Sequence, residues 1–77
     1  MTRDAIHIDA RGEKCPMPVV LLARAVRAAV PGSAVTVITD DPAACHDIPA
    51  WCRMRGATYV ELSQANGIDT HRITLGS

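Results

Sequence analysis

Two strand-to-helix junctions, each marked by a proline, constrain the fold of this chain more than any other feature. Residues 5–9 alternate between apolar and polar side chains, and residues 34–39 are rich in β-branched side chains, so both segments predict strands. Pro16 follows the first strand and Pro42 follows the second. Proline is favoured in the first turn of a helix because its missing N–H would have no partner there. The sequence therefore predicts two strand-helix units in succession.

The predicted helices have recognisable starts and ends. The first covers residues 17–30, where apolar side chains recur at helical spacing, and it ends at the Pro-Gly pair that follows. The second covers residues 42–55, with Asp41 as its N-cap, and it ends at the next glycine. Pro49 lies inside this second segment, so a helix that restarts near Asp47 is the alternative.

The last part of the chain predicts a β-hairpin. Residues 57–65 and 68–75 flank Asn66-Gly67, which is the strongest short signal for a two-residue type I′ turn. In this register the apolar pair Val60–Ile73 falls on one side of the hairpin and the charged pair Glu61–Arg72 on the other, which supports the register. The predicted cross-strand pairs are Val60 with Ile73, Glu61 with Arg72, and Leu62 with His71.

The complete predicted element order is β-α-β-α-β-β. A crossover through a helix is right-handed, so the first two strands are predicted to be parallel and the fold to be an α/β (α+β) two-layer sandwich. With 77 residues, the chain is expected to form a single domain over residues 1–77. If the first two strands are neighbours, both helix N-termini emerge at one edge of the sheet, where chemistry is favoured in α/β folds.

Charge and composition argue against several classes of function. Lys and Arg total 8 and Asp and Glu total 8, and this neutral balance argues against direct nucleic-acid binding.

The apolar stretch over 16–30 is short and interrupted by arginines, so we expect no signal peptide, no membrane contact and a cytoplasmic protein. The three cysteines are then expected to be thiols. A sheet with helices on one side can leave its other face wet, which favours a monomer.

Cys15 is the candidate for chemistry. It lies next to the predicted start of the first helix, where free backbone N–H groups and the helix dipole favour a thiolate. Arg11 and Lys14 add positive charge nearby, so we expect a low thiol pKa and a nucleophilic sulfur. Pro18 stands where a Cys-x-x-Cys motif would have its second thiol, so a sulfur atom carried on Cys15 would persist.

The remaining cysteines and histidines give weaker signals. Cys45 lies in the first turn of the second helix, either as a packed residue or as a thiol that forms a disulfide with Cys15. Cys52 and Trp51 are expected in the core, with a partner-facing role as the alternative for Trp51. The sequence has no Cys-x-x-Cys or His-x₃-His pair, so we expect no metal site and interpret His71 as a strand-end residue that reaches water.

Three segments of the chain together match the pattern of a known family. The first is Asp9-x-Arg11-Gly12-x-x-Cys15-Pro16-x-Pro18, and the second is Pro31-Gly32 before the second strand. The third is Asp40-Asp41-Pro42-Ala43 with the following Asp47-Ile48-Pro49-Ala50-Trp51-Cys52. With these segments the chain resembles the TusA family of small sulfur-carrier proteins, also described as SirA-like.

The resemblance implies a mixed four-stranded sheet with both helices on one face. It also implies a sulfurtransferase in which Cys15 accepts sulfane sulfur as a persulfide and hands it to a partner protein, with no cofactor beyond that sulfur. The implied donors are cysteine desulfurases or rhodanese-like proteins. The implied acceptors serve tRNA thiolation, molybdenum-cofactor maturation or sulfur oxidation.

The other residues of the Cys-Pro-x-Pro motif and its leading segment are expected to support Cys15. Gly12 is expected to provide the turn, and Asp9 to hold the loop. Arg11 either lowers the thiol pKa, guides a partner, or pairs with Asp9. Pro16 and Pro18 stiffen the turn, which limits the entropy lost when a partner docks.

Glu13, Lys14 and Met17 are the candidate partner contacts. Many members of the family carry a leucine-type residue where this chain has Glu13, so this position is a candidate for partner choice. Two other functions stay open from the sequence. One is a thiol redox protein that uses Cys15 with Cys45, and the other is a non-enzymatic protein or RNA interaction module.

Overall fold

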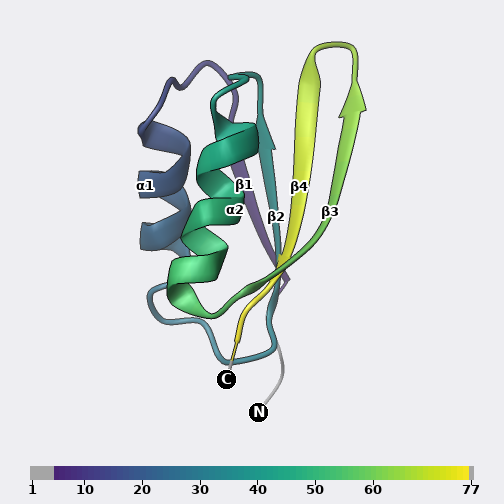
Figure 1. Ribbon diagram of the computed structural model, residues 1–77. Coiled ribbons are helices and arrows are strands. Elements are labelled where there is room, and N and C mark those ends of the chain that lie inside the picture. Colours follow the sequence, from purple (N-terminus) through teal and green to yellow (C-terminus); the bar gives the residue numbers. More distant parts are fainter. Residues whose placement is uncertain (1–4, 77) are drawn as a thin grey trace.

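The computed structural model describes residues 5–76 as one layer of strands covered by one layer of helices (Figure 1). The β-α-β-α-β-β order predicted from the sequence is confirmed. In chain order the elements are β1 (Ala5–Ala10), α1 (Met17–Ala25), β2 (Ala34–Thr39), α2 (Ala44–Arg55), β3 (Thr58–Ala65) and β4 (Ile68–Thr74).

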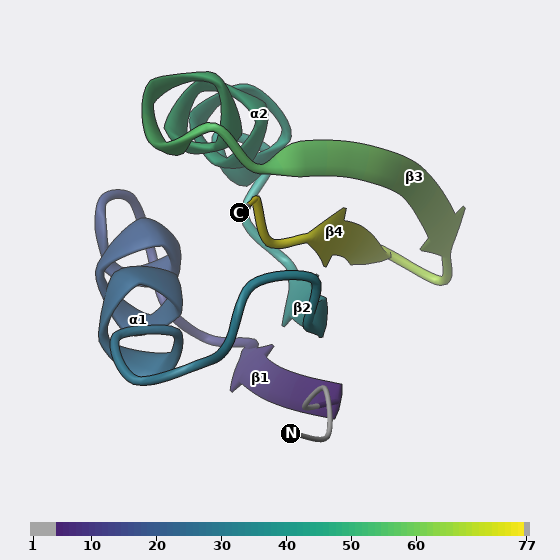
Figure 2. The same ribbon diagram turned by 90° about the horizontal axis from the view of Figure 1, so that it is seen from below.

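The four strands form one mixed sheet in the order β1-β2-β4-β3. β1 and β2 are parallel, while β4 is antiparallel to both of its neighbours. Seen along the strands, α1 and α2 lie on the same face of the sheet, with α1 beside β1 and α2 beside the β3-β4 hairpin (Figure 2). The two-layer sandwich is therefore the fold, and both strand-to-helix loops leave the same edge of the sheet. Within residues 5–76, no helix is long and apolar enough to cross a membrane.

The core fills the space between the sheet and the two helices. Alternate residues of β1, β2 and β4 are turned toward the helices, because successive side chains of a strand point to opposite faces. Trp51 and Cys52 belong to this core, as the sequence predicted. The buried apolar residues are Ile8, Ala10, Leu22, Val35, Val37, Ala44, Ile48, Trp51, Cys52 and Ile73.

Both helices are shorter than the sequence predicted. α1 ends at Ala25, because the N–H groups of Arg27 and Ala29 bond to carbonyls three residues back and turn the chain away from the helix. α2 begins at Ala44 after a similar tight turn, in which the N–H of Ala44 bonds to the carbonyl of Asp41. The helix ends at Arg55, and Gly56, which has φ of 71°, serves as the predicted glycine cap.

The Asn66-Gly67 turn forms as predicted. Both residues have positive φ, 53° for Asn66 and 76° for Gly67, as a type I′ turn requires. Two of the predicted cross-strand pairs are confirmed, Glu61 with Arg72 and Leu62 with His71. The first pair is also an ion pair, with 3.5 Å between Arg72 Nε and Glu61 Oε1.

The third predicted pair is wrong because the register shifts at Val60. Tyr59, not Val60, lies opposite Ile73, and the register irregularity falls between Tyr59 and Glu61. An extra residue on one strand is the mark of a β-bulge, which the turn and the pattern alone do not reveal. Val60 is left 57% exposed, and Tyr59 is turned toward the core.

Candidate functional site

The loop before α1 and the loop before α2 lie side by side and are joined by hydrogen bonds (Figure 1). The N–H of Gly12 donates to both carboxylate oxygens of Asp40 at 3.0 Å, and the N–H of Cys15 donates to Asp41 Oδ2 at 2.7 Å. Gly12 has φ of 83°, a conformation that favours glycine. Asp41 Oδ1 also accepts from the N–H of Ala43 at 3.2 Å. Two adjacent carboxylates of the second loop therefore hold the first loop in place.

Asp9 and Arg11 form an exposed ion pair at the end of β1. Arg11 Nε and a terminal guanidinium nitrogen donate to the two Asp9 oxygens at 2.9 and 2.8 Å. This side-chain hydrogen bond and the backbone N–H of Arg11 lower the pKa of Asp9 to about 2. The guanidinium charge is thus directed at Asp9, which supports the interpretation of Arg11 as a structural partner of this loop.

Cys15 is exposed, and its thiol lies against a carboxylate of α2. Pro16 is the N-cap of α1, and the Cys15 Sγ donates a hydrogen bond to Asp47 Oδ2 at 2.8 Å. The hydrogen bond to Asp47 is the largest cause that raises the pKa of the Cys15 thiol, followed by desolvation and by the negative charges of Asp47 and Asp41. The expectation of a low thiol pKa is therefore wrong for the free protein. Carboxylates of the second loop and helix outweigh the nearby basic residues.

A shallow, mainly apolar groove runs from Cys15 between α1 and α2. Its volume is about 310 Å³. Met54 at its far end is 83% exposed, which is unusual for a large apolar side chain and marks a surface that suits an apolar partner contact. The residues that line the groove are Cys15, Pro16, Val19, Asp47, Ala50, Trp51 and Met54.

The remaining residues of the sequence-predicted site differ in exposure. Lys14 is exposed beside Cys15, and Glu13 is half-buried in the same loop. Met17 is half-buried at the start of α1, where its N–H bonds to the carbonyl of Lys14 at 2.8 Å. Pro18 is buried and is the second residue of the helix, so it packs inside the molecule rather than bordering the thiol.

Sequence reasoning missed the carboxylate that contacts the candidate thiol. The sequence marks Asp47 as a possible helix start and as part of the family pattern, but not as a partner of Cys15, and it gives no signal for Met54 as a surface contact. A signal for Asp47 does exist, because an acidic residue in the first turn of the second helix comes to the same sheet edge as Cys15. The contact itself depends on how α1 and α2 pack, which neither residue encodes alone.

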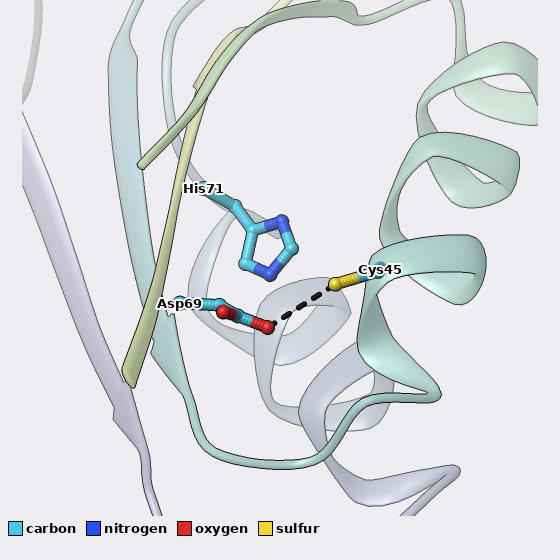
Figure 3. Close-up of side chains that lie close together, drawn as sticks. All are labelled: Cys45, Asp69 and His71. Carbon is cyan, nitrogen blue, oxygen red and sulfur yellow. Dashed lines mark hydrogen bonds between the residues drawn. The ribbon is translucent and has the colours of Figure 1, made fainter. Parts of the chain in front are cut away.

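A second group of polar side chains lies away from Cys15, between α2 and the hairpin. The Cys45 Sγ donates to Asp69 Oδ2 at 3.1 Å, and this bond raises the pKa of Cys45 (Figure 3). His71 is fully buried, so the prediction that it reaches water is wrong. β4 is an inner strand, and this residue faces the helices. Its Nδ1 lies 2.6 Å from the hydroxyl of Tyr59 and its Nε2 lies 3.4 Å from that of Thr39, and desolvation lowers its pKa.

Comparison with known proteins identifies the family over nearly the whole chain. The family model described as "Sulfurtransferase TusA" matches residues 6–75. The chain belongs to the TusA family. The crystal structure of a SirA-like protein from Desulfitobacterium hafniense is similar, with a TM-score of 0.75 and 29% sequence identity. The match covers 94% of this chain and 99% of that one. TusA proteins are sulfurtransferases and sulfur carriers that act between sulfur donors and acceptors, and a sulfur-carrier role is the broad function of this chain.

Proposed function

We propose that this protein carries sulfane sulfur as a persulfide on Cys15. The observation that supports this most directly is the exposed Cys15 thiol at the rim of an apolar groove. Cys15 also lies in the Cys-Pro-x-Pro segment by which the sequence resembles the family. Cys45 is half-buried and bonded to Asp69, and Cys52 is buried, so neither presents a comparable thiol to a partner protein.

The transfer step conserves atoms and electrons. The Cys15 thiolate attacks the outer sulfur of a persulfide on the donor protein, and a new S–S bond forms to Cys15. The S–S bond of the donor breaks at the same time, and the donor cysteine leaves as a thiolate that takes up a proton. One sulfur atom moves between proteins, and no external oxidant or reductant is needed. Delivery repeats the step with Cys15 as the leaving group. A nucleophile of the acceptor attacks the outer sulfur, the S–S bond to Cys15 breaks, and Cys15 leaves as a thiolate.

Asp47 controls when Cys15 reacts. In the free protein its carboxylate accepts the thiol proton in a hydrogen bond and disfavours the thiolate. A donor protein that places a cationic side chain against Asp47 removes this effect, so the thiolate forms in the docked complex. After transfer, the like charge of Asp47 repels the anionic terminal sulfur and directs it outward, toward an acceptor.

The surface around Cys15 suits contact with a partner protein, and the partner classes are those that the resemblance implies. The groove and Met54 offer an apolar contact. Glu13, Lys14 and Met17, which are close to Cys15 in the sequence and at least partly exposed, are the further contacts that we propose. We assign the donor to the cysteine desulfurases or rhodanese-like proteins. The acceptor belongs to tRNA thiolation, molybdenum-cofactor maturation or sulfur oxidation, as the resemblance implies.

A cytoplasmic monomer fits this role. The free thiols suit a reducing compartment. His7, Thr36, Arg72 and Glu61 form one cross-strand row on the face of the sheet away from the helices, and this polar row favours contact with water.

The test is sulfur loading followed by intact mass measurement without reductant. The reduced protein is incubated with a cysteine desulfurase and cysteine, beside Cys15→Ser and the matched control Cys45→Ser. We expect a gain of one sulfur atom in the wild type and in Cys45→Ser, reversed by reductant, and no gain in Cys15→Ser.

A rhodanese with thiosulfate is the second donor in the same test. If neither donor adds sulfur while Cys15 still alkylates, the persulfide proposal fails. Equal loading of wild type and Cys15→Ser would contradict the assignment of the site.

A further inference from the structure

Cys45, Asp69 and His71 converge at a place that sulfur transfer on Cys15 does not use. Cys45 comes from the first turn of α2, and the other two residues come from β4 (Figure 3). One ligand atom from each residue, a sulfur, a carboxylate oxygen and an imidazole nitrogen, lies within 4.8 Å of the other two. A thiol, a carboxyl and an imidazole from two elements far apart in the sequence therefore share one site between α2 and the hairpin.

We propose that these three side chains bind a divalent transition-metal ion of the zinc type. Cys45 would bind through its thiolate, Asp69 through a carboxylate oxygen and His71 through Nε2, with water in the fourth position. Sulfur, nitrogen and oxygen are together the donor set that zinc accepts in proteins, and three protein ligands with an open position are typical of its non-structural sites. This inference goes beyond the sulfur-carrier function.

The distances suit a tetrahedral ion after small side-chain movements. Ligand bonds of about 2.0–2.3 Å place the donor atoms of a tetrahedral zinc site roughly 3.3–3.8 Å apart. The Cys45 Sγ and Asp69 Oδ2 are already 3.1 Å apart, and the widest separation within the group is below 4.8 Å. Movements of about 1 Å at the ends of the side chains complete the geometry.

Two neighbours from β3 orient the ligands. The Tyr59 hydroxyl lies 2.6 Å from His71 Nδ1 and the Thr39 hydroxyl lies 3.4 Å from Nε2. In the tautomer with the proton on Nδ1, Nδ1–H donates to Tyr59 and the lone pair of Nε2 is left for the metal. Gln64 Nε2 donates to Asp69 Oδ1 at 3.1 Å, which leaves Oδ2 facing Cys45. Hydrogen-bonded partners of this kind are what fixed metal ligands have in known sites.

The binding step balances in charge and protons. The ion displaces the proton that the Cys45 thiol now donates to Asp69, and that proton is released to solvent. The thiolate and the carboxylate together neutralise the two positive charges of the ion, and the imidazole stays neutral. No oxidation or reduction takes place.

Cobalt(II) is the probe for this site, because its visible spectrum reports tetrahedral geometry and its near-ultraviolet charge-transfer band reports a bound thiolate. The reduced, chelator-treated protein is titrated with Co²⁺ alone, and Zn²⁺ is then added. We expect both spectral features to saturate at one equivalent and to bleach when one equivalent of Zn²⁺ replaces the cobalt.

Two ligand variants, one variant of a neighbouring residue and one control test the assignment. Cys45→Ser and Asp69→Asn are expected to weaken Co²⁺ binding by more than about 100-fold, and Cys45→Ser removes the charge-transfer band. Tyr59→Phe, which keeps every ligand but loses the bond to Nδ1, is expected to weaken binding about tenfold. His46→Ala, beside Cys45 in sequence but outside the cluster, is the matched control and is expected to bind normally. Circular dichroism of each variant confirms that it folds.

The result is independent of the sulfur-carrier proposal. Cys15→Ser is expected to give the full cobalt spectrum, while Cys45→Ser is expected to load sulfur normally. Absence of a thiolate band in the wild type, or a band that survives Cys45→Ser and disappears in Cys15→Ser, would overturn the metal site. Neither result would change the outcome of the sulfur-loading test.

Discussion

The Cys15 Sγ donates a hydrogen bond of 2.8 Å to Asp47 Oδ2, so the exposed thiol before α1 is paired with a carboxylate of the neighbouring helix α2. This pairing raises the thiol pKa, whereas the sequence around Cys15 predicted a lowered one. The free protein is therefore expected to hold its nucleophile in the protonated, less reactive form. A thiol in this form reacts more slowly with electrophiles than a thiolate does.

Asp47→Asn is expected to lower the pKa of Cys15. The amide removes the negative charge and the carboxylate acceptor that stabilise the neutral thiol. Alkylation of Cys15 by iodoacetamide at neutral pH should be several-fold faster, and the midpoint of its pH-rate profile should move to lower pH. Asp69→Asn, which alters the carboxylate beside Cys45, is the control and should leave the profile unchanged. An unaltered profile in Asp47→Asn would show that the contact does not control the thiol.

The ion pair of Asp9 with Arg11 predicts a pH response that can be measured at one carboxyl group. The pKa of Asp9 is lowered from 3.8 to about 2, so the ion pair favours the folded state above the ordinary pKa and is lost as the pH falls through about 2. An NMR titration of the Asp9 carboxyl carbon is expected to show a midpoint near 2 in the wild type.

Arg11→Gln is the matched variant for this titration. It is expected to return the Asp9 midpoint toward the ordinary value, because the guanidinium hydrogen bonds are lost. High salt should act in the same direction, since both side chains are more than half exposed and their attraction is screened. A wild-type midpoint at the ordinary value would contradict the ion pair.

Met54 is expected to contribute to docking of the sulfur donor. Met54→Asp places a charge at the exposed end of the groove, so sulfur uptake from the donor should slow about tenfold, equivalent to about 1.4 kcal/mol of docking energy. The measurement is the initial rate of sulfur loading by mass spectrometry. The rate at which iodoacetamide alkylates Cys15 should not change, because Met54 is not part of the hydrogen bond between the Cys15 thiol and Asp47. Arg53→Asp, an exposed neighbour outside the groove, is the control, and an equal loss in both variants would contradict a specific contact.

Mild oxidation is expected to leave Cys15 and Cys45 unlinked. The two thiols bond to different carboxylates, Cys15 to Asp47 on α2 and Cys45 to Asp69 on β4. Cys45 and Asp47 are two residues apart on α2, so they do not share a face of the helix. Peptide mapping without reductant tests this, with Cys45→Ser as the reference. An abundant Cys15–Cys45 disulfide peptide would favour the thiol redox function instead.

Leu22→Ala is expected to destabilise the protein by about 2–5 kcal/mol, because Leu22 is fully buried between α1 and the sheet and its removal leaves a cavity. Chemical denaturation measures the change in the free energy of unfolding. Arg24→Ala, on the exposed side of the same helix, should change stability by no more than about 0.5 kcal/mol. Similar losses in both variants would mean that Leu22 is not a core residue.

Local chemistry in the sequence was enough to predict the element order, the hairpin turn and the position of Cys15 in the loop before α1. Proline at each junction and glycine at the second helix end act over a few residues, and Asn66-Gly67 restricts its own backbone. The same local signals located the helix ends only within a few residues. α1 ends at Ala25 because the N–H groups that follow it bond to carbonyls three residues back instead of four. This tighter turn forms where the chain turns toward the sheet, so local sequence signals do not locate it.

The chemistry of the site was decided by tertiary contacts. Asp47 lies 32 residues after Cys15, and only the packing of α2 beside α1 brings its carboxylate to the thiol and raises the thiol pKa. His71 is buried because β4 inserts between β2 and β3, and Val60 is exposed because a bulge shifts one register position. The sequence alone thus determined the order and type of the elements and the place of Cys15 just before the first helix. Which charges surround each thiol depended on how the helices and strands pack, because electrostatic interactions act through space rather than along the chain.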